Sequence, residues 1–188
     1  GLPATLAAHK LKKPIRCILP RTVDMVSTGA RHNYRADYKV GCMKDGKLVA
    51  IDYQLYSNGG HTCDVSQGLM ENTVLSIDNA YNFNNMSVRG QSLRSNTPSN
   101  TSCRGAGNLQ GIFFSENVIH HVANELGLDP AKVREMNLHQ DRDVTHYGQV
   151  LENVTIKRCW DELMASAEVD KRQAMVQTFN SENKMKKR

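Results

Sequence analysis

The stretch that decides the fold is "RADYKVGCMKDGKLVAIDYQLYSNGG", residues 35–60. Apolar and polar residues alternate on both sides of Asp45-Gly46, a dipeptide that favours a tight turn between two strands. A two-residue loop at this point would place Cys42 opposite Val49. The sequence therefore predicts an antiparallel β-hairpin over about residues 36–58.

The same register sets the pairs farther from the turn. They would lie on one face of the hairpin and are mostly apolar, as expected for a sheet with one buried face. These pairs are Val40 with Ile51, Tyr38 with Tyr53, and Ala36 with Leu55.

Around the hairpin, apolar spacing predicts helices at about residues 65–77, 109–126, 130–137 and 156–168. Gly127 suits the end of the second helix, and Asp129-Pro130 suits the start of the third. The second helix is predicted to bury a stripe made of Leu109, Ile112, Phe113, Ile119, Val122, Ala123 and Leu126. Two further runs, residues 15–19 and 85–96, are predicted as strands. The fold class that follows is α+β.

Composition narrows the function classes. The 188 residues carry a formal net charge of +5, much of it in "HKLKKPIR" (residues 9–16) and "NKMKKR" (residues 183–188). Neither run is interleaved with aromatic residues, so solvated ends are favoured over a nucleic-acid surface. The densest apolar segment, residues 112–122, is interrupted by polar residues and is too short to span a bilayer.

The five cysteines are dispersed, without the short spacings of a zinc site or a disulfide framework. We therefore expect reduced thiols and a cytoplasmic protein. The chain opens without a methionine, in what reads as the middle of a helix. For this reason we expect it to be part of a longer protein.

One loop stands out as a candidate for chemistry. Residues 101–111 read "TSCRGAGNLQG", with glycines on both sides of Ala106 and a helical pattern after them. Glycines allow close approach of the backbone to a ligand, and a helix N-terminus presents free N–H groups. The spacing matches neither a phosphate-binding P-loop nor a dinucleotide-binding fingerprint. Spacing alone leaves both an anion cradle and a plain turn open.

Few other residues suggest catalysis. Glu71, beside Asn72 in the predicted helix 65–77, is either a buried general acid or base or a surface residue, and the pattern favours the surface. His120 and His121 are adjacent in sequence, so they lie on different faces of a helix and cannot chelate one metal ion there.

Three longer segments carry a resemblance. Residues 19–60, 96–138 and 143–163 are similar, in order, to the molybdopterin-binding region of the xanthine dehydrogenase and aldehyde oxidase family. The segments "CRGAG" (residues 103–107) and "SENVIHH" (residues 115–121) are most similar to invertebrate, especially insect, aldehyde oxidases. The match covers nearly the whole chain.

The resemblance implies a molybdenum enzyme that hydroxylates an aldehyde or a heterocycle with oxygen from water. Its full-length form would be a homodimer with a molybdenum–molybdopterin cofactor, two [2Fe–2S] clusters and FAD, which pass electrons to O2. The general-base glutamate would lie downstream of Arg188, so the present chain is expected to be inactive alone. No nucleic-acid or membrane partner is expected.

The resemblance also assigns site residues. Arg104, Gly105 and Gly107 would contact the cofactor, with the main-chain N–H of Arg104 close to the molybdenum. Glu71, Asn72 and Ala106 would line the substrate pocket. Xanthine dehydrogenases have arginine at the position of Asn72 and phenylalanine at that of Ala106. Asparagine cannot offer a bidentate cation, and alanine cannot stack on a flat ring.

These two departures favour an aldehyde oxidase. A xanthine dehydrogenase with a changed pocket and a non-catalytic basic binding module remain as alternatives. The resemblance places residues 1–138 in the later part of the first molybdopterin-binding subdomain. Residues 139–150 would be a linker, and residues 151–188 would begin the second subdomain.

Overall fold

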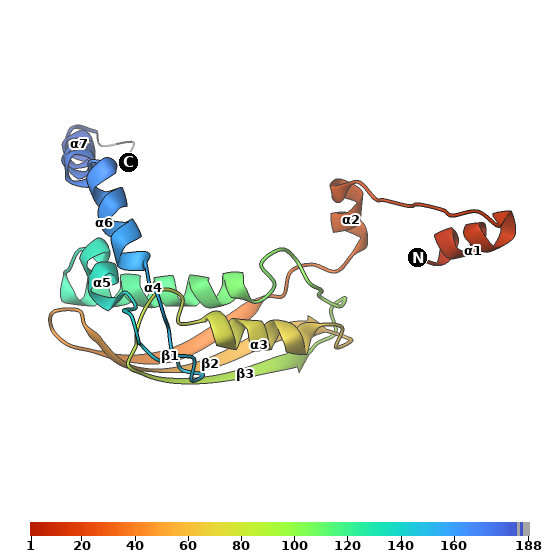
Figure 1. The fold of residues 1–188 in the computed structure, drawn as a ribbon, viewed down its shortest axis with the longest axis horizontal. Coiled ribbons are helices and arrows are strands. Elements are labelled where there is room, and N and C mark those ends of the chain that lie inside the picture. The colour runs from red at the N-terminus through yellow and green to blue at the C-terminus, as the bar shows by residue number, and fades with distance from the viewer. Residues whose placement is uncertain (184, 186–188) are drawn as a thin grey trace.

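A computed structural model describes residues 1–183 and 185, so most of the basic run 183–188 lies outside the described residues. Within them the fold is α+β, as predicted (Figure 1). The elements in chain order are α1 (Leu2–Leu11), α2 (Arg21–Ser27), β1 (Tyr34–Cys42), β2 (Leu48–Gly60), α3 (Ser66–Ser76), β3 (Asn85–Arg94), α4 (Asn108–Leu126), α5 (Pro130–Asn137), α6 (Ile156–Ser166) and α7 (Val169–Glu182).

The three strands form one sheet in the order β1-β2-β3. β1 and β2 are antiparallel, whereas β2 and β3 are parallel. A parallel pair needs a crossover, and α3 supplies it. Helices α3 and α4 lie over one face of the sheet (Figure 1). Between these layers lies the core, built around Tyr53, Leu55, Ile77, Val118 and Ile119.

The predicted hairpin is confirmed, with one correction at its turn. Val40, Tyr38 and Ala36 pair as expected with the residues opposite them on β2, but Cys42 pairs with Leu48 rather than Val49. The amide of Gly46 donates to the carbonyl of Met43 (3.0 Å), and Gly46 has φ = +98°. The loop therefore has three residues and ends in a glycine with positive φ. The register shift lies between Gly41 and Cys42, where Val49 is the extra residue on β2.

The segment before the hairpin differs from the expectation. Residues 15–19 do not form a strand, and they are exposed. No described strand runs beside them, so their backbone groups have no ladder to join. Residues 21–32, for which the sequence suggests only a connector with a turn at Gly29, contain the short helix α2.

The predicted α3, α4, α5 and α6 agree with the structure to within two residues at each end. The predicted buried face of α4 is wrong in its first half, since Leu109, Ile112 and Phe113 are exposed. A Cβ on Gly111 would lie 2.9 Å from the Thr73 carbonyl oxygen of α3, and the fully buried Ser115 donates to the Ile77 carbonyl. Small residues thus bring the two helix backbones together, and the large apolar ones face outwards.

Residues 139–150, predicted as a linker, fold back against the body of the chain. Val144 and Val150 form an antiparallel bridge, and His139 donates its backbone N–H to the Ala80 carbonyl at 2.9 Å. α6 and α7 follow and bury no residue completely. Among the described residues, no helix combines the length and apolar character that crossing a membrane would require.

Candidate functional site

The glycine loop, residues 101–107, lies between α3 and the segment that leads into β1. Its final residue sits against α3, because a Cβ on Gly107 would lie 2.2 Å from the Leu69 carbonyl oxygen. Gly107 has φ = +86° and Gly105 has φ = +71°, values that favour glycine. Both glycines of the predicted cofactor contact are therefore required by the backbone itself.

Side chains from outside the loop hold its carbonyl groups. Arg31 donates from Nη2 to the Arg104 carbonyl at 2.6 Å. Asn72 donates from Nδ2 to the Ala106 carbonyl at 3.2 Å, and Thr73 donates from Oγ1 to the Gly107 carbonyl at 3.0 Å. Three loop carbonyls are thus satisfied from the protein side.

The N–H groups of the same loop are left open. Arg104 and Gly105 are exposed, and the N–H of neither residue meets an acceptor within the part of the chain that the structure describes. Free N–H groups ahead of a helix N-terminus suit a ligand that accepts hydrogen bonds. The molybdenum cofactor expected from the resemblance is such a ligand, so the residues present fit it.

The structure brings Asn72 and Ala106, two of the predicted pocket residues, into direct contact through the bond described above. Glu71 is exposed on α3, and its Oε1 accepts from Gln67 at 3.2 Å. This is the surface position that the helical pattern favoured. The roles of all three toward a substrate stay predictions.

Sequence reasoning missed the residues that support the loop. Nothing in the local sequence around Arg31 or Thr73 indicates that their side chains bond to this loop. The bonded loop residue lies 73 positions after Arg31 and 34 positions after Thr73. Gln110 was missed as well. It lies in the first turn of α4 with 8% of its surface exposed, and neither atom of its side-chain amide has a partner within the described residues. A buried, unpaired amide of this kind points to an absent partner.

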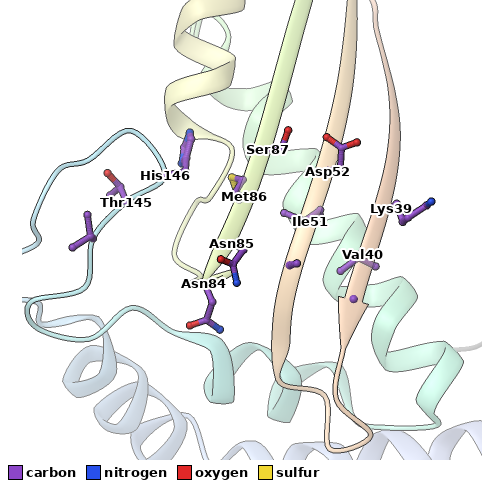
Figure 2. Close-up of a pocket in the computed structure, with 13 residues that line it drawn as sticks. Lys39, Val40, Ile51, Asp52, Asn84, Asn85, Met86, Ser87, Thr145 and His146 are labelled. Carbon is purple, nitrogen blue, oxygen red and sulfur yellow. The ribbon is translucent and has the colours of Figure 1, made fainter.

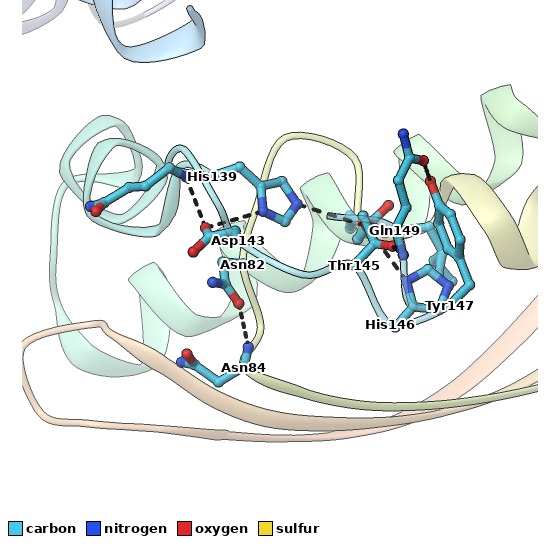
Figure 3. A network of polar contacts seen from close by, with 12 residues as sticks. Asn82, Asn84, His139, Asp143, Thr145, His146, Tyr147 and Gln149 are labelled. Atoms are coloured by element: carbon cyan, nitrogen blue, oxygen red, sulfur yellow. Dashed lines mark hydrogen bonds and ion pairs between the residues drawn. The ribbon is translucent and has the colours of Figure 1, made fainter. Parts of the chain in front are cut away.

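A second polar cluster joins residues 139–150 to the body of the chain (Figure 3). Asp78 lies 3.5 Å from Nδ1 of His146 and 3.7 Å from Nε2 of His139, and Asp143 lies 3.4 Å from Nδ1 of His139. His146 also bonds the Val74 carbonyl through Nε2 at 2.7 Å. Among the described residues, no group of three or more acidic, histidine or cysteine side chains could hold a metal ion. The printed contacts of the cluster fasten this loop to the body of the chain.

A hollow of about 860 Å³ lies on the polar face of the sheet (Figure 2). Lys39, Asp52 and Ser87 line it on the strands, and His146 lines it from the 139–150 segment. It sits near the start of β2 and β3, whereas the glycine loop adjoins the other end of these strands. None of the predicted site residues reaches it.

Comparison with known proteins shows the family of the chain. A model of the molybdopterin cofactor-binding domain matches residues 2–138. The chain is 42% identical over 183 residues to a xanthine dehydrogenase/oxidase of Gallus gallus. The aligned residues cover 97% of this chain and 14% of the relative. It is 41% identical over 185 residues to a xanthine dehydrogenase of Oryza sativa, covering 98% of the chain and 14% of the relative. The chain thus spans about one-seventh of the length of these curated relatives.

Solved structures share the fold. An aldehyde oxidoreductase from Desulfovibrio gigas superposes with a TM-score of 0.73 at 25% identity, over 84% of this chain and 17% of that one. A quinoline 2-oxidoreductase from Pseudomonas putida gives a TM-score of 0.74 at 20% identity, over 96% of this chain and 24% of that one, which shows likeness of fold alone. The matched relatives carry the name xanthine dehydrogenase, so the similarity does not single out insect aldehyde oxidases. The chain belongs to the xanthine dehydrogenase family of molybdenum hydroxylases and forms part of its molybdopterin cofactor-binding domain.

Proposed function

We propose that this chain is the part of an aldehyde-oxidising molybdenum hydroxylase that forms one wall of the cofactor and substrate site. The observation that carries the proposal is the glycine loop, whose carbonyls are held inwards by Arg31, Asn72 and Thr73 while the N–H groups of Arg104 and Gly105 stay open. These N–H groups would hydrogen-bond to the bound cofactor. When bound, the cofactor would supply the two-electron redox chemistry, and the oxygen that enters the product would come from water.

The preference for aldehydes rests on Asn72 and Ala106. A purine presents a flat ring and polar edges, which an arginine and an aromatic ring would recognise. Here Asn72 is uncharged and bonds the loop, and Ala106 offers only a methyl group. A pocket walled by these residues suits a smaller or less polar carbonyl compound.

Purine hydroxylation is the second candidate, and the matched relatives favour it by their names. The complete protein decides between the two when it is assayed with benzaldehyde and with xanthine under the same conditions. We expect a higher kcat/KM for benzaldehyde. A higher kcat/KM for xanthine would reject the aldehyde proposal and leave the family intact.

A double variant sharpens the assay. Asn72→Arg with Ala106→Phe supplies the charge and the ring, so we expect the ratio of kcat/KM for xanthine to that for benzaldehyde to rise by about tenfold or more. Asn124→Arg, at an exposed position on α4, is the control for added charge and should leave the ratio unchanged.

The remaining features of the whole protein belong to the same proposal. It would carry two [2Fe–2S] clusters and FAD, deliver electrons to O2, act as a homodimer and reside in the cytoplasm. Iron and flavin content, sedimentation and the acceptor used in the assay test these features one at a time.

A further inference from the structure

Arg31 is held in place on both sides along the chain. The carbonyl of the preceding residue, Ala30, accepts from the Thr101 N–H at 3.0 Å. The following residue, His32, is 3% exposed, and its Nε2 lies 2.7 Å from the Ser66 hydroxyl at the start of α3. The backbone of Arg31 is therefore fastened both to the glycine loop and to α3.

From this position its side chain reaches one acceptor. Nη2 donates to the Arg104 carbonyl at 2.6 Å, a short charge-assisted hydrogen bond. Nη1 is buried and has no partner within the described residues, and no described carboxylate forms an ion pair with Arg31. The guanidinium thus bonds only the loop among the described residues, and it places a positive charge without a carboxylate partner next to the loop.

This bond fixes more than one atom, because a peptide group is planar. No cis peptide is present among the described residues, so the Gly105 N–H points opposite to the Arg104 carbonyl across a single trans peptide. Holding that carbonyl towards Arg31 turns the Gly105 N–H away from the protein. The exposed direction of the Gly105 N–H therefore follows from the bond between Arg31 and the Arg104 carbonyl.

We propose that Arg31 is a positioning residue, which holds the Arg104–Gly105 peptide so that its N–H faces the cofactor. The inference rests on the proposed function, since it assigns the loop to that site. Arg31 itself touches no reacting atom. Its effect is on the loop, and through the loop on turnover.

The test uses the complete protein with Arg31→Met, which keeps the length of the side chain without a donor, and Arg31→Lys, which keeps one donor and the charge. Arg35→Met is the matched control, because Arg35 is an exposed arginine four residues away that pairs with Asp37 at the surface. Hydrogen–deuterium exchange of a peptide spanning residues 101–107 reports the loop directly. Molybdenum content, kcat and KM are measured on the same samples.

For Arg31→Met we expect amide exchange in residues 101–107 to quicken by about tenfold to a hundredfold, in line with the loss of one charge-assisted bond. Per bound molybdenum, kcat should fall by about tenfold or more, with KM within about twofold of the wild-type value. Arg31→Lys should recover part of both losses, and Arg35→Met should change neither. Loop exchange and kcat within twofold of wild type in Arg31→Met would overturn the proposal.

Two outcomes separate this inference from the proposed function. If the wild-type protein holds no molybdenum and oxidises neither substrate, the proposed function fails, and the positioning role at the cofactor fails with it even where the exchange result stands. If the wild-type protein is active but the exchange of the loop is indifferent to Arg31, only the present inference fails. Should Arg31→Met not fold, Arg31→Lys still decides, because the shorter lysine reaches the Arg104 carbonyl less well and should lose part of both properties; loop exchange and kcat within twofold of the wild-type values would overturn the proposal.

Discussion

At the scale of single residues, Gly107 is where the loop and α3 come closest. An added Cβ would lie 2.2 Å from the Leu69 carbonyl oxygen, and the positive φ of +86° disfavours any side chain. We expect Gly107→Ala to lower the free energy of unfolding by roughly 2–4 kcal/mol, measured by urea denaturation of the chain. Gly105→Ala shares the positive φ, but its Cβ would meet nothing nearer than 3.7 Å, so it should cost about 1 kcal/mol. Equal losses in the two variants would contradict the close approach.

Asp78 and His146 make the stability of the fold depend on pH. Burial opposes ionisation of Asp78, but contacts from His139 and His146 outweigh it and lower the pKa of the carboxyl group. Burial also opposes the charge on His146, yet Asp78 and the Val74 carbonyl raise the pKa of the imidazole above its usual value. Asp78 stabilises the fold above an unfolded pKa of about 3.9, and this contribution is lost as the pH falls through the lower folded value.

For His146 the sign is opposite. Its contribution is complete below an unfolded pKa of about 6.5 and is lost as the pH rises through the higher folded value. The pair should therefore stabilise most between about pH 4 and 6.5. We expect Asp78→Asn to lower the free energy of unfolding by about 1–3 kcal/mol at pH 5.5 and by less at pH 8.5. Asp52→Asn, an exposed carboxylate on the sheet, is the control. An identical loss at both pH values would contradict the contribution of His146.

At the scale of elements, Asn137 ties the end of α5 to the hairpin. It is fully buried, accepts the Leu48 N–H at 2.9 Å, and donates to the carbonyls of Gly46 and Val133 at 3.0 and 2.8 Å. We expect Asn137→Ala to lower the free energy of unfolding by about 2–4 kcal/mol, because it leaves buried backbone groups unpaired. Asn124→Ala, at an exposed position on α4, should change it by less than about 0.5 kcal/mol. A loss below about 1 kcal/mol in Asn137→Ala would show that water replaces the amide.

How much of this could be read from sequence depends on the range of the interactions. The hairpin and four helices follow from local signals, namely Asp45-Gly46, Asp129-Pro130 and apolar spacing. The buried face of α4 does not follow from local signals. Gly111 and Ser115 are buried because α3 packs close to them, and their hydrophobicity does not reveal this. The run at residues 15–19 shows the reverse error, since an apolar pattern without a neighbouring strand makes no sheet.

The candidate site divides in the same way. The glycine loop was visible as a local pattern, and the resemblance gave it a role. The contact between Asn72 and Ala106 joins residues 34 positions apart, and the bond from Arg31 to Arg104 joins residues 73 positions apart. Such pairs depend on the chain path through the β2–α3–β3 crossover, which no window of sequence contains.

At the scale of the whole molecule, the proposed function makes the loop one wall of a larger site. We therefore expect the purified 188-residue chain to bind no molybdenum and to oxidise neither benzaldehyde nor xanthine. Elemental analysis by mass spectrometry and a dye-reduction assay provide the measurements, with the complete protein as the positive control. Stoichiometric molybdenum in the isolated chain would show that these residues suffice to hold the cofactor.

The projecting N-terminal segment has a consequence for the shape of the chain in solution. α1 and α2 bury no residue and stand away from the sheet (Figure 1). The accessible surface is 12,969 Å², whereas a compact protein of 21.0 kDa would expose about 9,000 Å². Small-angle X-ray scattering of the isolated chain should accordingly give a radius of gyration well above the roughly 16 Å of a compact 188-residue domain. The excess area is surface that projecting segments such as α1 and α2 leave open to solvent.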